Sequence, residues 1–202
     1  MSELITVGVV TVLYNSAAEL PDFVVSLSTQ RDVRIRLYAV DNASTDDSVS
    51  ILREAMIPNG QVEVIVCAEN LGVAEGNNIG IRAALRDGVD WILLLNNDTE
   101  FPPTMIRSLV DVAEKHDRPV VSPVIEGDNP RGTVWYGGGH WRSWRGHQIE
   151  HEHWKEDLAS RLAEVGDADD TVYAPTCCLL VRPDVFERVG LMDASYFVYY
   201  DD

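Results

Sequence analysis

A short apolar run that ends abruptly in polar residues gives the strongest indication of how this chain folds. The five residues 91–95 are all apolar, and Asn96, Asn97 and Asp98 follow them directly. An unbroken apolar run of this length predicts a strand covered on both faces, as in the middle of a mostly parallel sheet. Such sheets bind ligands at the carboxyl ends of their strands. An Asx-rich turn that only closes the strand is the alternative interpretation.

The same order of strand, polar turn and helix recurs along the first ~115 residues, as expected of an α/β domain. Ser44 and Asp47 have the spacing of a capping box before the second helix, and Pro102-Pro103 is expected to open the fourth. The repeat predicts a doubly wound, Rossmann-like α/β sheet covered by helices. Strands are expected at 5–13, 35–40, 62–66 and 91–95, with helices at 19–30, after residue 47, at 73–86 and after residue 103.

The regular order is expected to break down after residue 118. We predict a fifth strand at 119–125 and an irregular segment over the sheet edge from 126 to about 170, with a short helix at 157–165. Strand character returns at 172–181, and a helix runs from Pro183 to Gly190. His151 and His153 suggest a zinc site, but histidines two residues apart in a hydrophilic loop are usually solvated.

Polar side chains stand at the end of each of the four parallel strands. Because these ends share one edge of the sheet, they predict a nucleotide crevice with a metal-binding acid. There is no G-x-G-x-x-G after the first strand and no Walker lysine motif. Gly76 and Gly80 in the third helix would let a ligand approach, or else serve only packing. The strand-end residues are Tyr14, Asn15, Asp41, Asn42, Asn70, Asn96, Asn97 and Asp98.

The charge and composition narrow the choice of partners. The 202-residue chain has a formal net charge of −17, which argues against nucleic acid and against an anionic membrane surface. A phosphate ligand would therefore need a local source of positive charge, such as a bound metal ion. Three cysteines without zinc spacing indicate a reducing compartment. Without a signal peptide or a membrane-spanning run, we expect a cytoplasmic protein, free or peripheral at the inner membrane face.

Six stretches in this order resemble the family 2 inverting glycosyltransferases of GT-A fold, especially rhamnosyltransferase-like members that build surface polysaccharides. The resemblance implies a three-layer α/β/α domain with a mostly parallel central sheet. One catalytic domain would span 1–202 and continue beyond it, with a nucleotide-binding half at 1–118 and an incomplete acceptor-side half at 119–202. The stretches are 10–15, 40–48, 70–80, 95–99, 135–139 and 191–202.

The resemblance also implies roles for individual residues. Asn96-Asn97-Asp98 is similar to the D-x-D element of the family, so Asp98 would bind Mg²⁺ or Mn²⁺, although Asn96 replaces the first acid. Asp201-Asp202 stands where the family has Glu-Asp, and Asp202 would be the general base. The residues implied to line the nucleotide pocket are Thr11, Tyr14, Asp41, Asn70, Asn77, Asn96 and Asn97.

The expected function is that of a metal-dependent, inverting hexosyltransferase. It would move a sugar from a nucleotide-sugar donor, with dTDP-rhamnose implied by the resemblance, to a saccharide or lipid-linked glycan acceptor. A nucleotide-sugar-binding module without turnover is the main alternative. A nucleotidyltransferase ranks lower because the Gly- and Arg/Lys-rich phosphate loop expected after the first strand is absent.

Overall fold

The computed structural model describes residues 4–142 and 148–197. The chain divides into two compact units. The first comprises residues 1–120 and 176–202, and the second residues 121–175. No helix within the described ranges is both long and apolar enough to cross a membrane.

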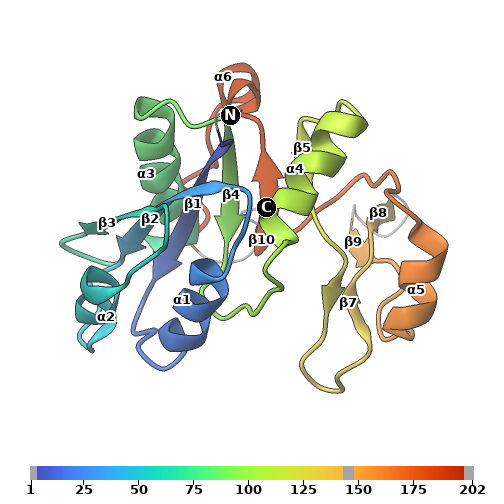
Figure 1. Cartoon of the computed structure of the whole chain (residues 1–202), viewed down its shortest axis with the longest axis horizontal. Helices are drawn as coiled ribbons and strands as arrows, with labels where there is room; N and C mark the ends of the chain where they lie inside the picture. Colours follow the sequence, from blue (N-terminus) through green and yellow to red (C-terminus); the bar gives the residue numbers. More distant parts are fainter. Residues whose placement is uncertain (1–3, 143–147, 198–202) are drawn as a thin grey trace. The chain divides into compact units, whose positions relative to one another are not determined.

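The first unit is built on a mostly parallel sheet, as predicted (Figure 1). The described strands follow the order β3-β2-β1-β4-β10-β5. The first four in this order are parallel, whereas β10 runs antiparallel to β4. The strands are β1 (Thr6–Leu13), β2 (Arg34–Asp41), β3 (Gln61–Val66), β4 (Trp91–Leu95), β5 (Val120–Val121) and β10 (Cys178–Val181).

Helices form the outer layers of this α/β/α unit. Even-numbered strand residues such as Val10 and Tyr38 pack against buried residues of α3, including Ile81 and Ala84. Successive strand side chains point to opposite faces, so odd-numbered residues such as Val9 and Leu37 lie on the other side. The helices of this unit are α1 (Leu20–Ser28), α2 (Ser48–Glu54), α3 (Gly72–Arg86), α4 (Met105–Lys115) and α6 (Pro183–Val189).

Prolines account for three differences from the predicted elements. A strand over 119–125 is wrong: only Val120–Val121 joins the large sheet, and Pro123 separates it from β6 (Ile125–Glu126), which lies in another sheet. The strand predicted at 172–181 begins only at Cys178, after Pro175. Pro102 and Pro103 do not open α4, which begins at Met105 after a turn.

The predicted capping box at the start of α2 is also wrong. Asp47 is the N-terminal cap residue, but its side chain makes no cap hydrogen bond. The Asp46 carboxylate instead accepts from the Ser48 backbone N–H at 3.1 Å and from its hydroxyl. The Ser44 hydroxyl accepts from the Asn15 N–H, so it is engaged by a different turn.

The second unit contains more regular structure than the sequence indicates. Two antiparallel pairs occur among its described residues, so the segment after residue 126 is not irregular throughout. The predicted helix at 157–165 is confirmed as α5, and the Asp157 carboxylate caps it by accepting from the Ser160 N–H at 2.9 Å. The elements are β6, β7 (Val134–Tyr136), β8 (Gly139–Arg142), β9 (Gln148–His151) and α5 (Leu158–Val165).

Candidate active site

The carboxyl ends of the four parallel strands meet at one edge of the sheet, as predicted. Leu13, the last residue of β1, pairs with Asp41 of β2, and Asp41 pairs with Val66 at the end of β3. On the other side of β1, Val10 pairs with Leu94, one residue before β4 ends. The register therefore brings the polar residues that follow these strands to a common rim.

Hydrogen bonds join the turns along this rim. Asn15, whose φ of 54° lies in the left-handed region that Asn tolerates, accepts at its side-chain oxygen from the Thr45 N–H at 2.8 Å. The Asn15 N–H donates to the Ser44 hydroxyl at 2.9 Å. The Asn97 side-chain amide donates to the Val12 carbonyl at 2.7 Å. The turn after β1 is thus linked to the turn after β2, and the end of β1 is linked to the turn after β4.

Asp41 is a buried carboxylate with one unsatisfied oxygen. Asp41 is 1% exposed. Its Oδ2 atom accepts a hydrogen bond from the Ser44 N–H at 3.2 Å, while its Oδ1 atom has no hydrogen-bond partner among the described residues. Burying an unpaired carboxylate oxygen is costly, so such an atom marks a place where a ligand donor would be stabilising. Burial raises the pKa of the nearby Cys67 thiol, and the negative charges of Asp41 and Glu75 raise it further.

The Asn96-Asn97-Asp98 turn presents one free carboxylate. Asp98 is exposed and makes no hydrogen bond or ion pair with any residue that the structure describes. The turn is held by the Asn96 N–H, which donates to the Cys177 carbonyl at 2.9 Å, and by the Thr99 hydroxyl, which donates to the Asn96 carbonyl. The Asp98 carboxylate, which the sequence predicts to bind a metal ion, is therefore presented on a fixed turn.

The donor set fits an open cation site and does not fit a closed one. Within residues 4–142 and 148–197, no group of three or more His, Cys, Asp and Glu side chains could hold a metal ion. Mg²⁺ and similar hard cations commonly use one or two protein carboxylates and take other oxygens from substrate phosphates. Asp98 with the amide oxygen of Asn96 suits that arrangement.

The other predicted pocket residues differ in accessibility. Tyr14 is 56% exposed and Asn70 is half-buried, with its side-chain oxygen accepting from the Gly72 N–H. Thr11 is 1% exposed, and its hydroxyl has no partner among the described residues; Asn77 is 7% exposed. Their roles stay predictions. Asp201 and Asp202 lie outside the described residues.

Gly76 and Gly80 serve helix packing, so the prediction that they admit a ligand is wrong. A Cβ on Gly76 would lie 2.8 Å from Val12 Cγ1, and one on Gly80 would lie 2.4 Å from Val10 Cγ1. The small residues let α3 approach β1 closely, which was the alternative interpretation. The space above β1 is filled by the helix itself.

Two buried asparagines make contacts that the sequence did not predict. Asn42, 2% exposed, donates from its side-chain amide to the Gly72 carbonyl at 3.0 Å. Asn78, also 2% exposed, exchanges two hydrogen bonds with the backbone of Met192. The clustering of Asn residues around the start of α3 was the available signal, since buried amides need several partners.

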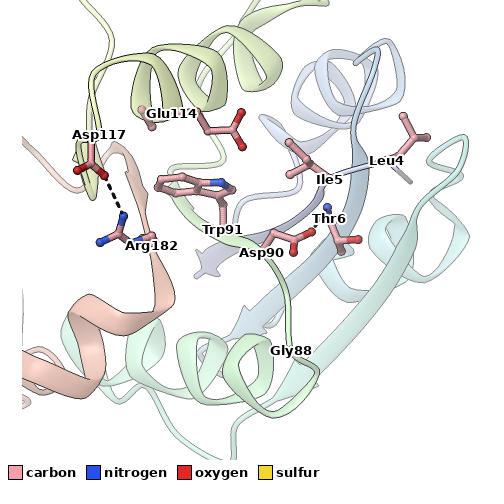
Figure 2. A pocket seen from close by; sticks show the side chains of 10 residues that line it. Leu4, Ile5, Thr6, Gly88, Asp90, Trp91, Glu114, Asp117 and Arg182 are labelled. Carbon is pink, nitrogen blue, oxygen red and sulfur yellow. Dashed lines mark hydrogen bonds and ion pairs between the residues drawn. The ribbon is translucent and has the colours of Figure 1, made fainter. Parts of the chain in front are cut away.

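A pocket of about 750 Å³ lies at the opposite, amino-terminal edge of the sheet (Figure 2). Thr6 and Trp91, the first residues of β1 and β4, help to line it. Asp117 and Arg182 form an ion pair there at 3.6 Å. The pocket contains none of the predicted site residues and is a competing location for a ligand.

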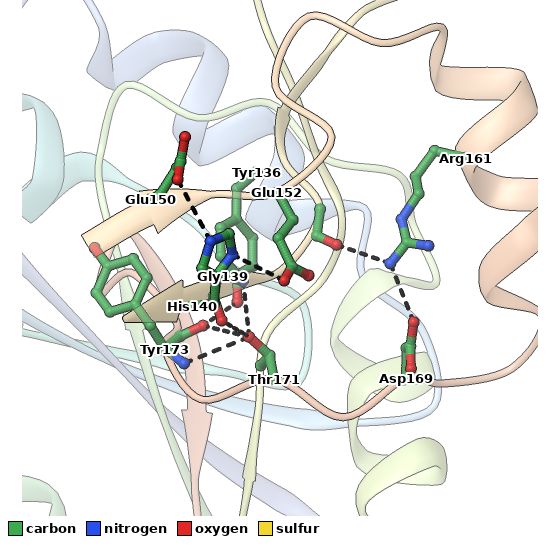
Figure 3. A network of polar contacts seen from close by, with 10 residues as sticks. Tyr136, Gly139, His140, Glu150, Glu152, Arg161, Asp169, Thr171 and Tyr173 are labelled. Atoms are coloured by element: carbon green, nitrogen blue, oxygen red, sulfur yellow. Dashed lines mark hydrogen bonds and ion pairs between the residues drawn. The ribbon is translucent and has the colours of Figure 1, made fainter. Parts of the chain in front are cut away.

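The second unit holds a separate polar network around β8 and β9 (Figure 3). His140 lies between two carboxylates, 3.0 Å from Glu152 and 3.4 Å from Glu150. Arg161, 6% exposed, donates to the Gly137 carbonyl at 2.9 Å and to Asp169 at 3.3 Å. These contacts stabilise the glycine turn between β7 and β8.

His151 and His153, the pair that suggested zinc, turn to different partners. The His151 ring nitrogen lies 3.1 Å from the Trp135 carbonyl, and its ring stacks on Tyr173. His153 lies 2.9 Å from Glu156. The two imidazoles therefore do not share a ligand position.

Solved structures with similar folds identify the fold. The chain matches Staphylococcus aureus TarS in complex with UDP with a TM-score of 0.70 and 15% identity, over 98% of this chain and 53% of that one. It matches GalNAc-T7 with UDP, GalNAc and Mn²⁺ with a TM-score of 0.74 and 18% identity, over 98% of this chain and 39% of that one. The fold is that of the GT-A glycosyltransferases.

The chain belongs to glycosyl transferase family 2, whose model matches residues 8–190. It is 27% identical to an N-acetylglucosaminyl-diphospho-decaprenol L-rhamnosyltransferase of Mycobacterium tuberculosis, over 96% of this chain and 67% of that protein. It is 24% identical to a low-salt glycan biosynthesis hexosyltransferase of Haloferax volcanii, over 91% and 59%. The chain spans about half the length of the TarS structure and about two thirds of the rhamnosyltransferase.

Proposed function

We propose that the protein is a metal-dependent inverting glycosyltransferase that uses a nucleotide-sugar donor. The observation that carries the proposal is the buried Asp41 carboxylate oxygen, which has no hydrogen-bond partner among the described residues and lies on the same strand-end rim as the exposed Asp98. A nucleoside offers N–H and O–H donors to the first group, and a cation-bound diphosphate suits the second. The family membership supports the same conclusion.

Each end of the donor has its own set of residues in this proposal. Asp41 would accept a hydrogen bond from the base or ribose, and exposed Tyr14 would pack on the base. Asn96 would bond a ribose hydroxyl, while Asp98 would hold Mg²⁺ or Mn²⁺. The bound cation would supply charge stabilisation for the departing diphosphate. Thr11, Asn70, Asn77 and Asn97 would complete the pocket.

Transfer itself requires a base opposite the leaving group. Asp202 would remove the proton from the acceptor hydroxyl. The hydroxyl oxygen would bond to the anomeric carbon as the bond from that carbon to the diphosphate breaks, which inverts the configuration. The neighbouring carboxylate of Asp201 would disfavour the charged form of Asp202 and so raise its basicity. These two residues would thus form the catalytic pair.

The substrates follow from the relatives, as part of the proposal. The name of the Mycobacterium tuberculosis relative supports dTDP-rhamnose as the first donor to test and a lipid-linked glycan as acceptor, with a saccharide as the simpler candidate. Residues 1–118 would bind the nucleotide, and residues 119–202 would contribute to the acceptor side. The protein would work in the cytoplasm or at the inner membrane face.

A panel of UDP-, GDP- and dTDP-sugars with and without Mn²⁺, measured by thermal shift and by donor hydrolysis, tests the proposal. We expect cation-dependent stabilisation and slow hydrolysis with one nucleotide class. Binding without any hydrolysis or transfer would favour the nucleotide-sugar-binding module, which the Asn96 substitution in the D-x-D element supports.

Two substitutions separate metal binding from catalysis. Asp98→Asn should weaken cation-dependent donor binding by roughly 1–3 kcal/mol, because a charge-assisted contact is lost. Asp202→Asn should abolish transfer and leave the donor Kd nearly unchanged. Asp117→Asn, which changes a 96% exposed side chain at the opposite edge, serves as the control. Unchanged affinity in Asp98→Asn would remove Asp98 from the metal role.

A further inference from the structure

The loop after β1 (residues 14–19) and the loop after β2 (residues 42–47) are joined by one carboxylate. The Asp46 Oδ1 atom accepts from the Ser48 N–H at 3.1 Å and from the Ser48 hydroxyl. The Asp46 Oδ2 atom accepts from the Ala17 N–H at 3.0 Å, across 29 positions of sequence. The side chain of Asp46 therefore bridges the two loops.

Ser48 extends the bridge beneath the surface. It is fully buried, and its hydroxyl donates to Asp46 while accepting from the Ser16 N–H at 2.9 Å. Because a hydroxyl has a single proton, the carboxylate that takes this proton leaves an oxygen lone pair for Ser16. The hydrogen bond from Ser48, aided by the backbone N–H donors, holds the pKa of the Asp46 carboxyl below its usual range. Asp46 is thus an ionised acceptor at neutral pH.

The same two loops carry the groups proposed to contact the nucleoside. The Ser44 hydroxyl accepts from the Asn15 N–H at 2.9 Å, and the Ser44 N–H donates to Asp41 Oδ2 at 3.2 Å. Exposed Tyr14 directly precedes Asn15 in the chain. Tyr14 and Asp41 are therefore attached to the loops that Asp46 joins, one on each side.

We infer that Asp46 is a positioning residue that holds the two loops together and so fixes the nucleoside end of the donor pocket before the donor binds. This inference rests on the proposed function. Asp46 acts through Ser48 and Ala17 and is not among the residues proposed to contact the donor. Loops that are already ordered lose less conformational entropy when a ligand binds. Loss of the bridge should therefore weaken nucleotide binding and leave the chemical step unchanged.

The variant Asp46→Asn separates the bridge from the local turn. Its remaining side-chain oxygen can keep both bonds from Ser48, but its NH₂ group would face the Ala17 N–H, donor against donor. Asn stabilises the start of a helix about as well as Asp does, so Tm should stay close to that of wild type. Asp46→Ala removes all these contacts and should lower Tm as well.

Two other aspartates provide matched controls. Asp47 is the next residue, is exposed, and makes no cap hydrogen bond through its side chain, so Asp47→Asn removes a charge from the same turn without touching the bridge. Asp157 makes the same local contacts as Asp46, because its carboxylate accepts from the Ser160 N–H at 2.9 Å and from the Ser160 hydroxyl at 2.8 Å. Asp157→Ala should lower Tm without changing nucleotide affinity.

The test compares wild type, Asp46→Asn and Asp46→Ala with the controls Asp47→Asn and Asp157→Ala. It measures Tm, hydrogen exchange at Ser16 and Ala17, and the Kd of whichever of UDP, GDP and dTDP binds wild type most tightly. We expect both Asp46 variants to raise this Kd about five- to tenfold, equally with and without Mn²⁺, because the loops hold the nucleoside end. The KM of the nucleotide sugar should rise to match, with kcat within about twofold of wild type. Exchange at Ala17 should be faster, and both controls should keep the wild-type Kd.

Several results would overturn the inference. One is a Kd in the Asp46 variants within about twofold of that of Asp47→Asn, and another is unchanged exchange at Ala17. A loss of affinity seen only with Mn²⁺ would place the effect of Asp46 at the diphosphate end, and an equal loss in Asp157→Ala would show general destabilisation. Wild-type protein that binds none of the three nucleotides would refute the proposed function itself. Faster exchange at Ala17 in Asp46→Asn would then still show that Asp46 joins the loops.

Discussion

The side-chain amide of Asn97 donates to the backbone carbonyl of Val12 at 2.7 Å, across 85 residues of sequence. Val12 is the second-last residue of β1, and Asn97 belongs to the turn after β4. The bond fixes the turn that carries Asp98 against the neighbouring strand. The rim at which the strands end is therefore a connected structure.

Replacing Asn97 by Ala should loosen this turn. The Val12 carbonyl would lose its side-chain donor, so we expect the free energy of unfolding to fall by about 1 kcal/mol. Cation-dependent nucleotide affinity should fall as well, because Asp98 would no longer be held in place. Urea unfolding and calorimetry measure the two effects. Affinity equal to that of wild type at reduced stability would show that the turn need not be fixed for binding.

Asp41→Asn tests the unsatisfied buried oxygen directly. The amide can keep the bond from the Ser44 N–H, but it presents N–H to a ligand donor where the carboxylate presented an acceptor. We expect nucleoside diphosphate affinity to fall about ten- to hundredfold. The Tm of the free protein should not fall, because a buried charge has been removed. A Kd within twofold of wild type would exclude Asp41 from the pocket, and Asp117→Asn again provides the control.

Gly80→Ala should destabilise the protein even though Ala is the better helix former. The new methyl would lie 2.4 Å from Val10 Cγ1, and Val10 is fully buried and β-branched, so it cannot rotate away easily. Overpacking costs about 1–3 kcal/mol, against a gain of up to about 1 kcal/mol in helix propensity. The double variant Val10→Ala/Gly80→Ala should lose less free energy of unfolding than the sum of the losses in the two single variants. Additive losses in denaturant unfolding would contradict the proposed contact.

Tyr38 should make stability depend on alkaline pH. Burial raises its pKa to about 12, aided by the hydrogen bond that its hydroxyl donates to Asp87 at 3.0 Å. An unfolded tyrosine ionises near pH 10, so the Tyr38 contribution is complete below that pH and is lost between about pH 10 and 12. The stability advantage of wild type over Tyr38→Phe should therefore shrink across this range. A constant difference in unfolding free energy up to pH 11.5 would contradict the raised pKa.

The first four strands and their helices could be predicted because hydrophobic periodicity is local. The run 91–95 and the β-branched run that became β1 needed no tertiary information. The elements after residue 118 were harder, because Pro123 and Pro175 divide apolar runs into strands that join different sheets or begin late. Strand partners depend on distant residues, which no single stretch of sequence contains.

The candidate site was predictable in its location more than in its detail. The polar residues after each strand indicated the rim, and the register confirms that they share it. The packing role of Gly80 and the two hydrogen bonds between the Asn78 side chain and the Met192 backbone were not predictable. Each depends on how α3 lies against another segment. Composition alone cannot distinguish a glycine that admits a ligand from one that admits a valine.

The location of the bound cation decides whether the donor site lies at the carboxyl-terminal rim of the sheet. Mn²⁺ broadens the NMR signals of nearby amides, so titrating it into protein saturated with a nucleoside diphosphate maps the site. We predict broadening of the Asn42, Asn70 and Asn97 amides at the carboxyl-terminal rim, lost in Asp98→Asn, with sharp signals for Thr6 and Asp90. Broadening centred on Thr6 and Trp91, which line the pocket at the opposite edge, would contradict the account.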